Sequence, residues 1–298
     1  MKKLFMTVVA MLAFVTGFAQ LVTVQSVNKL DGILSEKAVI SPAGDFVVVN
    51  TANSLKRVNV ADGSQSEIVK GSGLYNFAVS ADGSQVVYTR PSYKKNHLRY
   101  NALEAVNLSD GTVKTIVKPT RRLNSGFSVA NGSVNAVENG KLRTVATGTG
   151  KAVKAPVASI SYGHLQVTVN GKTKTIDPQG RGSYIWPSVS PDGTRVCYWL
   201  VGQGCFTCNL DGSDVKSHGP LRAAVWAGNK MLVGQDEVEG NAQQLAACSI
   251  VALDVNTNEV QKLTDDSVIA TYPSASADGS RIAFSTPTGE IYVINLSK

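Results

Sequence analysis

The chain has 298 residues and a formal net charge of +7, with 43% hydrophobic and 17% charged residues. This composition excludes a disordered or low-complexity chain, and the length is sufficient to bury a large core without disulfides. The excess of basic residues is modest, and these residues are spread along the chain. Nucleic-acid-binding proteins concentrate their basic residues in one patch, so no nucleic-acid partner is expected.

Residues 1–19 have the pattern of a secretory signal peptide. Two lysines precede an apolar run from Leu4 to Val15, and small residues follow at Gly17 and Ala19. The apolar run is shorter than the roughly 20 residues that cross a bilayer, so a retained membrane anchor is the weaker alternative. We therefore expect cleavage after Ala19 and a periplasmic or secreted chain that does not span a membrane. A single domain over residues 20–298 is predicted.

A strand–turn–strand unit recurs along this domain. The copies are SPAGDFVVV from Ser41, SADGSQVVY from Ser80, SPDGTRVCY from Ser190 and SADGSRIAF from Ser276. The Asp-Gly or Ala-Gly pair suits a tight turn, and the alternation that follows places every second side chain on one face of a sheet. A second turn follows in the better-kept copies, so each unit becomes an antiparallel meander of strands a, b, c and d. Repeated four-stranded meanders of about 40 residues are typical of a β-propeller.

The spacing of these units predicts an all-β, seven-bladed propeller of four-stranded antiparallel blades. Residues 127–185 lack the Asp-Gly turn and are interpreted either as two short blades, divided near Pro156, or as one irregular blade, which would leave six. The chain ends on IYVINLSK, which has the pattern of a third strand, and LVTVQSVNK from Leu21 alternates like a strand. We expect this N-terminal strand to complete the last blade and close the ring, which removes an open sheet edge.

Two repeats resemble the Pro-Ser-x-Ser-x-Asp-Gly motif of TolB-like propellers. They are YIWPSVSPDGTRVCYW from Tyr184 and TYPSASADGSRIAFST from Thr271. The copy at Ser41 departs from the motif through Ala-Gly in place of Asp-Gly, and the copy at Ser80 lacks the preceding proline. The resemblance implies a periplasmic protein-interaction module, although the motif describes a fold and carries no activity with it. The helical N-terminal domain of TolB itself has no counterpart in this sequence, which argues against that component.

The candidate binding residues gather in the first of two long insertions between strands b and c. This insertion, RPSYKKNHLRYN from Arg90 to Asn101, mixes cationic and aromatic side chains suited to an anionic or glycan surface. A solvated loop with incidental charge is the alternative. Together with two arginines from a neighbouring loop, the candidates are Arg90, Tyr93, Lys94, Lys95, His97, Arg99, Tyr100, Arg121 and Arg122. The second insertion, from Gly234 to Gln244, is acidic, but the spacing of Asp236, Glu237 and Glu239 is not that of a calcium loop.

Few features of the sequence point to catalysis. No G-x-S-x-G elbow is present, which argues against a serine hydrolase. The three histidines are His97, His164 and His218, and the strand scheme places His164 on the face opposite the other two, so they are not expected to converge on a metal. The three tryptophans are expected in the core between blades: Trp186, Trp199 and Trp226. We expect no catalytic residue, no metal and no cofactor.

The four cysteines of an exported chain are candidates for disulfides. Counting back across the turn at Gly202–Gln203 places Cys197 opposite Cys208, as a cross-strand pair. Cys205 would then remain for Cys248. A zinc site built from all four is the weaker alternative because their spacing is uneven. Cys205 and Cys208 form a C-x-x-C on a strand, where side chains three residues apart point to opposite faces, so a redox-active pair is not expected.

These features predict an exported, non-catalytic scaffold that binds a protein, a peptide or a cell-envelope component on its loop-rich face. The alternative is a carbohydrate-binding or carbohydrate-cleaving propeller, with lyase activity as a minor possibility. The lining of the central channel near the starts of the inner strands discriminates between them. Converging His, Asp and Arg would favour the alternative, and small apolar residues would favour the scaffold.

Overall fold

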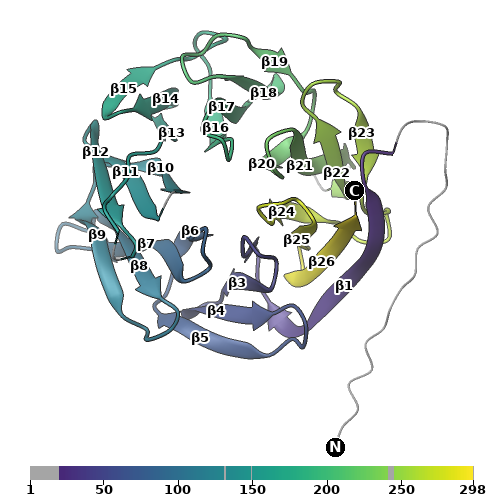
Figure 1. Ribbon diagram of the computed structural model, residues 1–298, viewed down its shortest axis with the longest axis horizontal. Helices are drawn as coiled ribbons and strands as arrows, with labels where there is room; N and C mark the ends of the chain where they lie inside the picture. Colours follow the sequence, from purple (N-terminus) through teal and green to yellow (C-terminus); the bar gives the residue numbers. More distant parts are fainter. Residues whose placement is uncertain (1–19, 131, 149, 241–244, 298) are drawn as a thin grey trace, which may run out of the picture.

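The computed structural model describes residues 20–130, 132–148, 150–240 and 245–297, so the predicted signal peptide lies outside the described residues. All regular secondary structure within these ranges is β-strand. The strands form seven antiparallel sheets that stand as blades around a central axis (Figure 1). The described residues contain no helix that could cross a membrane. The prediction of an all-β, seven-bladed propeller is confirmed, and the six-bladed alternative is wrong.

Five blades have four strands, ordered from the channel outward. Blade 1 consists of β2 (Ala38–Ile40), β3 (Phe46–Asn50), β4 (Ser54–Asn59) and β5 (Gln65–Lys70). Blade 2 consists of β6 (Tyr75–Val79), β7 (Gln85–Tyr93), β8 (Arg99–Asn107) and β9 (Val113–Thr120). Blade 5 consists of β16 (Tyr184–Val189), β17 (Arg195–Leu200), β18 (Gly204–Asn209) and β19 (Lys216–Ser217). Blade 6 consists of β20 (Arg222–Trp226), β21 (Met231–Glu239), β22 (Leu245–Asp254) and β23 (Val260–Lys262). Blade 7 consists of β24 (Thr271–Ala275), β25 (Arg281–Ser285), β26 (Glu290–Ser297) and β1 (Thr23–Leu34).

Blades 3 and 4 have only three strands each. Blade 3 consists of β10 (Leu123–Ala130), β11 (Ser133–Glu138) and β12 (Lys141–Ala146). Blade 4 consists of β13 (Val157–Ser161), β14 (His164–Val169) and β15 (Lys172–Thr175). Residues 127–185 therefore form two short blades divided near Pro156, the first of the two alternatives.

The ring closes through β1, the N-terminal strand. It pairs antiparallel with β26 from Thr23↔Ser297 to Leu34↔Glu290, as the outer strand of blade 7. Leu30 and Ile33 of β1 are buried against blade 1, so this strand seals both the sheet edge and the seam beside it. The predicted closure is confirmed.

The core consists of apolar clusters between neighbouring blades. One cluster joins blades 7 and 1 through Val47, Val49, Ala283 and Val293, and similar clusters join most other neighbours. These residues come from strands b and c, whose alternating β-branched side chains fill both faces of a blade.

The repeated turn is held by its serine and aspartate. In blade 2, Ser80 Oγ donates to Asp82 Oδ1 (2.6 Å), and the backbone N–H of Gln85 donates to Ser80 Oγ (2.9 Å). Blade 1 lacks Asp-Gly, but Ser41 Oγ donates instead to Asp45 Oδ1 (2.6 Å), one residue beyond the glycine. The motif is therefore selected by turn geometry. We name the face that carries these turns the turn face and the opposite face, which carries the b–c hairpins, the loop face.

Blade 4 runs in the direction opposite to its neighbours. After β12 the chain stays on the turn face, where Val153 N donates to Ser133 Oγ (2.8 Å) and Pro156 lies beside Gly193 of the blade 5 turn. Strand β13 consequently rises from the turn face to the loop face. There, Gly163 O accepts a hydrogen bond from Tyr184 N (3.3 Å) at the start of blade 5.

This reversal corrects the predicted position of His164. The residue follows the Tyr162–Gly163 turn and lies on the loop face. The prediction that it faces away from His97 and His218 was wrong, because it assumed an unbroken a–b–c–d order. The missing fourth strand of blade 3 changes the direction of every strand in blade 4.

Candidate functional site

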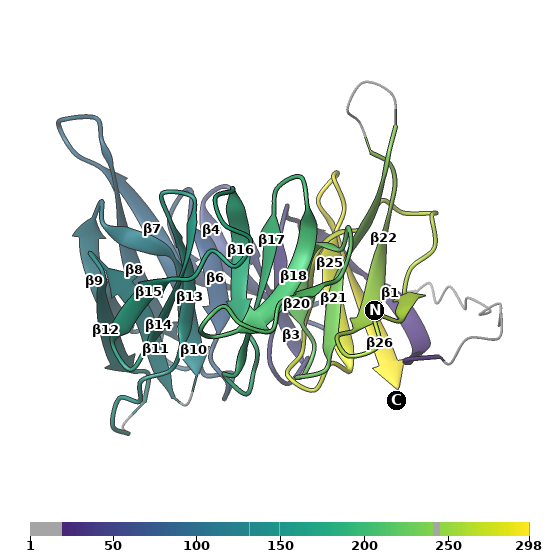
Figure 2. The ribbon, with the colours of Figure 1, turned by 90° about the horizontal axis from the view of Figure 1, so that it is seen from above.

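The first insertion is a long β-hairpin and not a loop. Strands β7 and β8 stay in register from Gln85↔Asn107 to Tyr93↔Arg99, which leaves only residues 94–98 as the turn. His97 occupies that turn with a φ of 59°, and its N–H donates to Lys94 O (2.9 Å). Figure 2 shows this hairpin rising from the same face of the disc as the β21–β22 hairpin. The predicted loop from Arg90 to Asn101 is thus corrected to a paired extension of the blade, which holds its side chains more rigidly.

Arg90 serves the blade itself and is not available to a ligand. Its Nε donates to Glu104 Oε2 (2.8 Å), and its Nη2 donates to Tyr88 Oη (3.2 Å). Burial, together with the neighbouring Glu104 carboxylate, raises the pKa of Tyr88 to about 12. Arg90 is therefore a structural residue at the base of the hairpin.

Two further cations pack on aromatic rings. Lys94 Nζ lies 4.3 Å from the ring centre of Tyr100, and Arg99 Cζ lies 4.6 Å from that of Tyr75. Such contacts fix the position of a cation and leave its outer side in water. Both charged groups are therefore fixed in position and are still accessible to a ligand from solvent.

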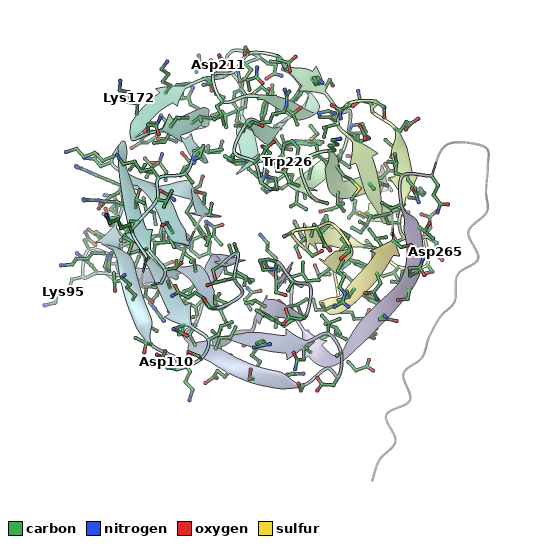
Figure 3. All side chains as sticks on the ribbon, in the orientation of Figure 1. Lys95, Asp110, Lys172, Asp211, Trp226 and Asp265 are labelled. Atoms are coloured by element: carbon green, nitrogen blue, oxygen red, sulfur yellow. The ribbon has the colours of Figure 1, made fainter. Side chains whose placement is uncertain are left out.

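The remaining candidates are exposed. The side chain of Tyr93 is 70% exposed, and Lys95 and His97 are exposed at the hairpin tip. Arg121 and Arg122 follow Thr120, which pairs with Asn101, so they lie beside the base of the hairpin. Lys95 projects from the outer edge of the disc (Figure 3). We name Lys94, Lys95, Arg99, Arg121 and Arg122 the hairpin surface.

The hairpin surface carries cations that no neighbouring carboxylate neutralises. Among the described residues, none of these five side chains has a carboxylate oxygen within 4.0 Å of its charged nitrogen. The predicted cations other than Arg90 thus lie along the hairpin, with Lys94, Lys95 and Arg99 toward its tip and Arg121 and Arg122 beside its base. The resulting positive field is suited to steering an anionic partner.

The acidic second insertion is partly used for internal pairing. Glu237 Oε2 accepts from Arg222 Nη1 (3.0 Å), and Glu237 Oε1 accepts from Gln235 Nε2 (2.9 Å). Residues 241–244 of this insertion lie outside the described part of the chain. Among the described residues, no group of three or more His, Cys, Asp or Glu side chains is placed to hold a metal ion.

The histidines have separate environments. His218 is 5% exposed and bridges two blades, with Nε2 2.9 Å from Thr207 Oγ1 and Nδ1 2.6 Å from Asn258 Oδ1. Burial lowers its pKa, so it is neutral at physiological pH. His164 Nδ1 lies 2.6 Å from Asp177 Oδ2 on the loop face. His97 lies on the hairpin tip.

All four cysteines are buried free thiols. The register places Cys197 opposite Thr207 and Cys208 opposite Val196, so the predicted pairing of Cys197 with Cys208 was displaced by one residue. A displacement of one residue puts Cys208 on the other face of the sheet. The closest thiols are instead Cys197 and Cys205, with their Sγ atoms 3.7 Å apart. Burial raises the pKa of Cys208 to about 12 and that of Cys248 to about 11, so these two thiols remain protonated.

Sequence reasoning missed a group of residues at the loop-face end of the channel. Trp226 is in the core at 9% exposure, as predicted, but Trp186 is 37% exposed and carries a φ of 51°. Tyr272 occupies the corresponding position of blade 7, with 46% exposure and a φ of 50°. The signal was present in the sequence, because both aromatics directly precede the proline of the repeated motif.

Comparisons with known proteins identify the fold alone. No protein-family model matches the chain, and no curated protein matches it in sequence. A chain of the solved structure "Crystal Structure of Mitotic Checkpoint Complex" superimposes with a TM-score of 0.60 at 13% identity, covering 97% of this chain and 100% of that one. Because 905 solved chains match significantly, the architecture is too widespread to select a function.

Proposed function

We propose that this chain is an exported, non-catalytic propeller that binds an anionic segment of a protein, or an anionic cell-envelope component, on its hairpin surface. The observation that carries the proposal is the paired β7–β8 hairpin, which presents Lys94, Lys95 and Arg99 without acidic partners. A rigid extension loses little conformational entropy on binding, since its backbone is already ordered. The chain of the mitotic checkpoint complex reported above supports the proposal only at the level of fold, because it is a propeller within a protein assembly.

The secretory pattern of residues 1–19 and the resemblance to TolB-like propellers support a periplasmic or secreted location. We accordingly propose that the partner is met in the cell envelope or outside the cell. N-terminal sequencing of protein recovered from the periplasm or the medium tests this, with residue 20 as the expected first residue.

The binding proposal is tested by charge reversal. The variant Lys94→Glu, Lys95→Glu, Arg99→Glu should lose the partner captured from a host envelope extract by the parent protein. Binding by the parent should weaken as salt rises, because exposed charges are screened within about 10 Å at 0.1 M salt. The matched control changes three exposed lysines outside the loop face: Lys151→Glu, Lys154→Glu, Lys230→Glu.

A second variant separates lost charge from lost folding. Replacing residues 93–99 with Asn-Gly joins Ser92 to Tyr100, which are already paired, by a two-residue turn. This variant should retain the parent's thermal unfolding midpoint and lose the partner. Equal capture by the parent, the charge-reversal variant and the shortened hairpin would refute the proposal.

A further inference from the structure

Exposed aromatic residues with left-handed backbone gather where the inner strands of blades 4, 5 and 7 meet the loop face. Tyr162, Trp186 and Tyr272 have φ values of 52°, 51° and 50°, and exposures of 101%, 37% and 46%. A bulky L-residue avoids this conformation. Asn76 and Ala223 have the same conformation, with φ values of 46° and 49°, at the matching positions of blades 2 and 6. The conformation therefore belongs to the repeat, and what distinguishes blades 5 and 7 is that it holds an exposed aromatic residue there.

The same local feature produces two of these positions. A β-bulge interrupts the pairing of β16 with β17 between Ile185 and Ser188, and another interrupts that of β24 with β25 between Thr271 and Ser274. A bulge re-aims the side chain it contains. Trp186 and Tyr272 are thereby left partly exposed, at 37% and 46%, although the ring centre of Trp186 still lies 6.4 Å from that of Trp199.

A chain of polar contacts connects blades 5, 6 and 7 between these aromatics. Arg222 Cζ lies 5.5 Å from the ring centre of Trp186, and Arg222 forms an ion pair with Glu237 (3.0 Å). Glu237 accepts from the buried Gln235, whose Oε1 accepts from the backbone N–H of Tyr272 (2.9 Å). The polar side chains between the two aromatic rings are therefore preorganised.

The three aromatics, on blades 4, 5 and 7, and Arg222, on blade 6, together form an arc over four consecutive blades. Strands β13, β16, β20 and β24 are the innermost strands of blades 4 to 7 around the central axis (Figure 1). The Tyr162–Gly163 turn contacts the start of blade 5 through the hydrogen bond from Tyr184 N to Gly163 O (3.3 Å). We name Tyr162, Trp186, Arg222 and Tyr272 the channel-mouth arc. It is separate from the hairpin surface, which lies over blades 2 and 3.

The chemistry of the arc fits a neutral, ring-shaped polar ligand. Aromatic faces offer apolar contact, and a few oriented polar groups supply specificity, as in most small-molecule sites. Arg222 is already neutralised by Glu237, so an anionic ligand would have to displace a carboxylate that a second hydrogen bond holds in place. A sugar ring satisfies both conditions, because its C–H face stacks on an aromatic ring while its hydroxyl groups bond to the guanidinium and carboxylate.

We propose that the channel-mouth arc is a binding site for a neutral oligosaccharide, stacked on Trp186 and Tyr272 and hydrogen-bonded to the Arg222–Glu237 pair. The four residues of the arc form neither the His-Asp-Arg cluster of a cleaving site nor the small apolar lining of a plain scaffold. Binding, and not cleavage, is the activity that this arrangement supports. The site functions independently of a protein partner on the hairpin surface.

The test titrates the purified chain with cellotetraose, maltotetraose and chitotetraose by calorimetry, and follows tryptophan fluorescence because Trp186 is the most exposed of the three tryptophans. At least one probe should bind saturably below about 10 mM. Tyr272→Gly and Trp186→Gly should each weaken that binding at least about tenfold. Glycine accepts a positive φ without strain, so both variants should remain folded.

The matched control is Asn139→Gly, which makes the same backbone change at a φ of 51° in a turn of blade 3, outside the arc. It should leave saccharide binding unchanged. A tetraglutamate peptide and trigalacturonate serve as anionic probes and should bind more weakly than the neutral sugar. The proposal is overturned if no neutral probe binds, if binding survives both glycine variants, or if an anionic probe binds more tightly through the arc.

Discussion

At the residue scale, the side chains that define the repeated turn act on their own backbone. Asp278 accepts from Ser276 Oγ (2.7 Å) and from the backbone N–H of Ser280 (2.9 Å). These hydrogen bonds, that from the Ser280 N–H foremost, lower the pKa of Asp278 to about 2. The aspartate was recognisable in the sequence because turn geometry selects it. The same logic could not identify Trp186, because the bulge that exposes it depends on the pairing of two strands.

The depressed pKa of Asp278 predicts an acid-sensitive contribution to stability. Because folding lowers this pKa, the contribution is complete above about pH 4 and is lost as the pH falls toward about 2. Asp278→Asn should lower the thermal midpoint at pH 7 by about 1–3 °C, since the side chain is exposed and the gain is screened.

The measurement is differential scanning calorimetry of the parent and the variant from pH 7 to pH 3. The difference between their midpoints should shrink as the pH falls. Asp31→Asn, which removes an exposed carboxylate on β1 outside the repeated turns, is the control for the loss of one surface charge. A difference for Asp278→Asn that stays constant with pH would contradict the assignment.

At the element scale, strand pairing decided matters that local patterns left open. The sequence around Arg90 to Asn101 has the composition of a loop, but two strands pair through it to Tyr93↔Arg99. The cysteine prediction failed for a related reason, because a displacement of one residue exchanges the faces of a strand. The direction of blade 4 follows from the number of strands before it. A short sequence pattern does not show how many strands precede it. The strand directions within residues 127–185 were therefore the least predictable part of the fold.

The junction between the short blades predicts a sensitive glycine. A Cβ at Gly126 of β10 would lie 2.2 Å from the backbone oxygen of Ala158 on β13. Around it, Asn124 Nδ2 donates to Ser159 Oγ (3.1 Å), so the two strands approach closely through polar contacts. Gly126→Ala should force these strands apart and lower the free energy of unfolding by about 1–3 kcal/mol.

Urea unfolding followed by circular dichroism measures this change. Gly148→Ala is the control, because nothing lies within 4 Å of a Cβ at that position. An unfolding midpoint for Gly126→Ala equal to that of Gly148→Ala would show that the junction tolerates separation.

At the scale of the whole molecule, closure by β1 makes the first residues of the described chain part of the last blade. Val22, Leu30 and Ile33 are each less than 9% exposed, and Lys29 pairs with Glu290 across the closing sheet. Fully burying one such apolar side chain contributes about 1.5–3 kcal/mol. Without this strand, β26 would present an open edge able to pair with another chain.

Removal of residues 20–34 should therefore destabilise the propeller by at least about 4 kcal/mol and cause self-association. Urea unfolding and size-exclusion chromatography measure the two effects. Addition of a synthetic peptide of residues 20–34 should restore the monomer, because it supplies the missing strand in trans. An unchanged unfolding midpoint after truncation would mean that the ring is held by its interblade clusters without β1.

The repeat pattern was sufficient for the all-β class, the seven blades and the closing strand, because each blade is a local meander whose turns and alternation are readable within about 40 residues. The candidate cations were also identifiable, since charge and insertion length are properties of the sequence. The tertiary structure alone decided that Arg90 is committed to Glu104, that His164 lies on the loop face and that Trp186 and Tyr272 share the channel mouth. Each of these depends on strand register, direction or the contact of separate blades, and such long-range pairings leave no mark in a local pattern.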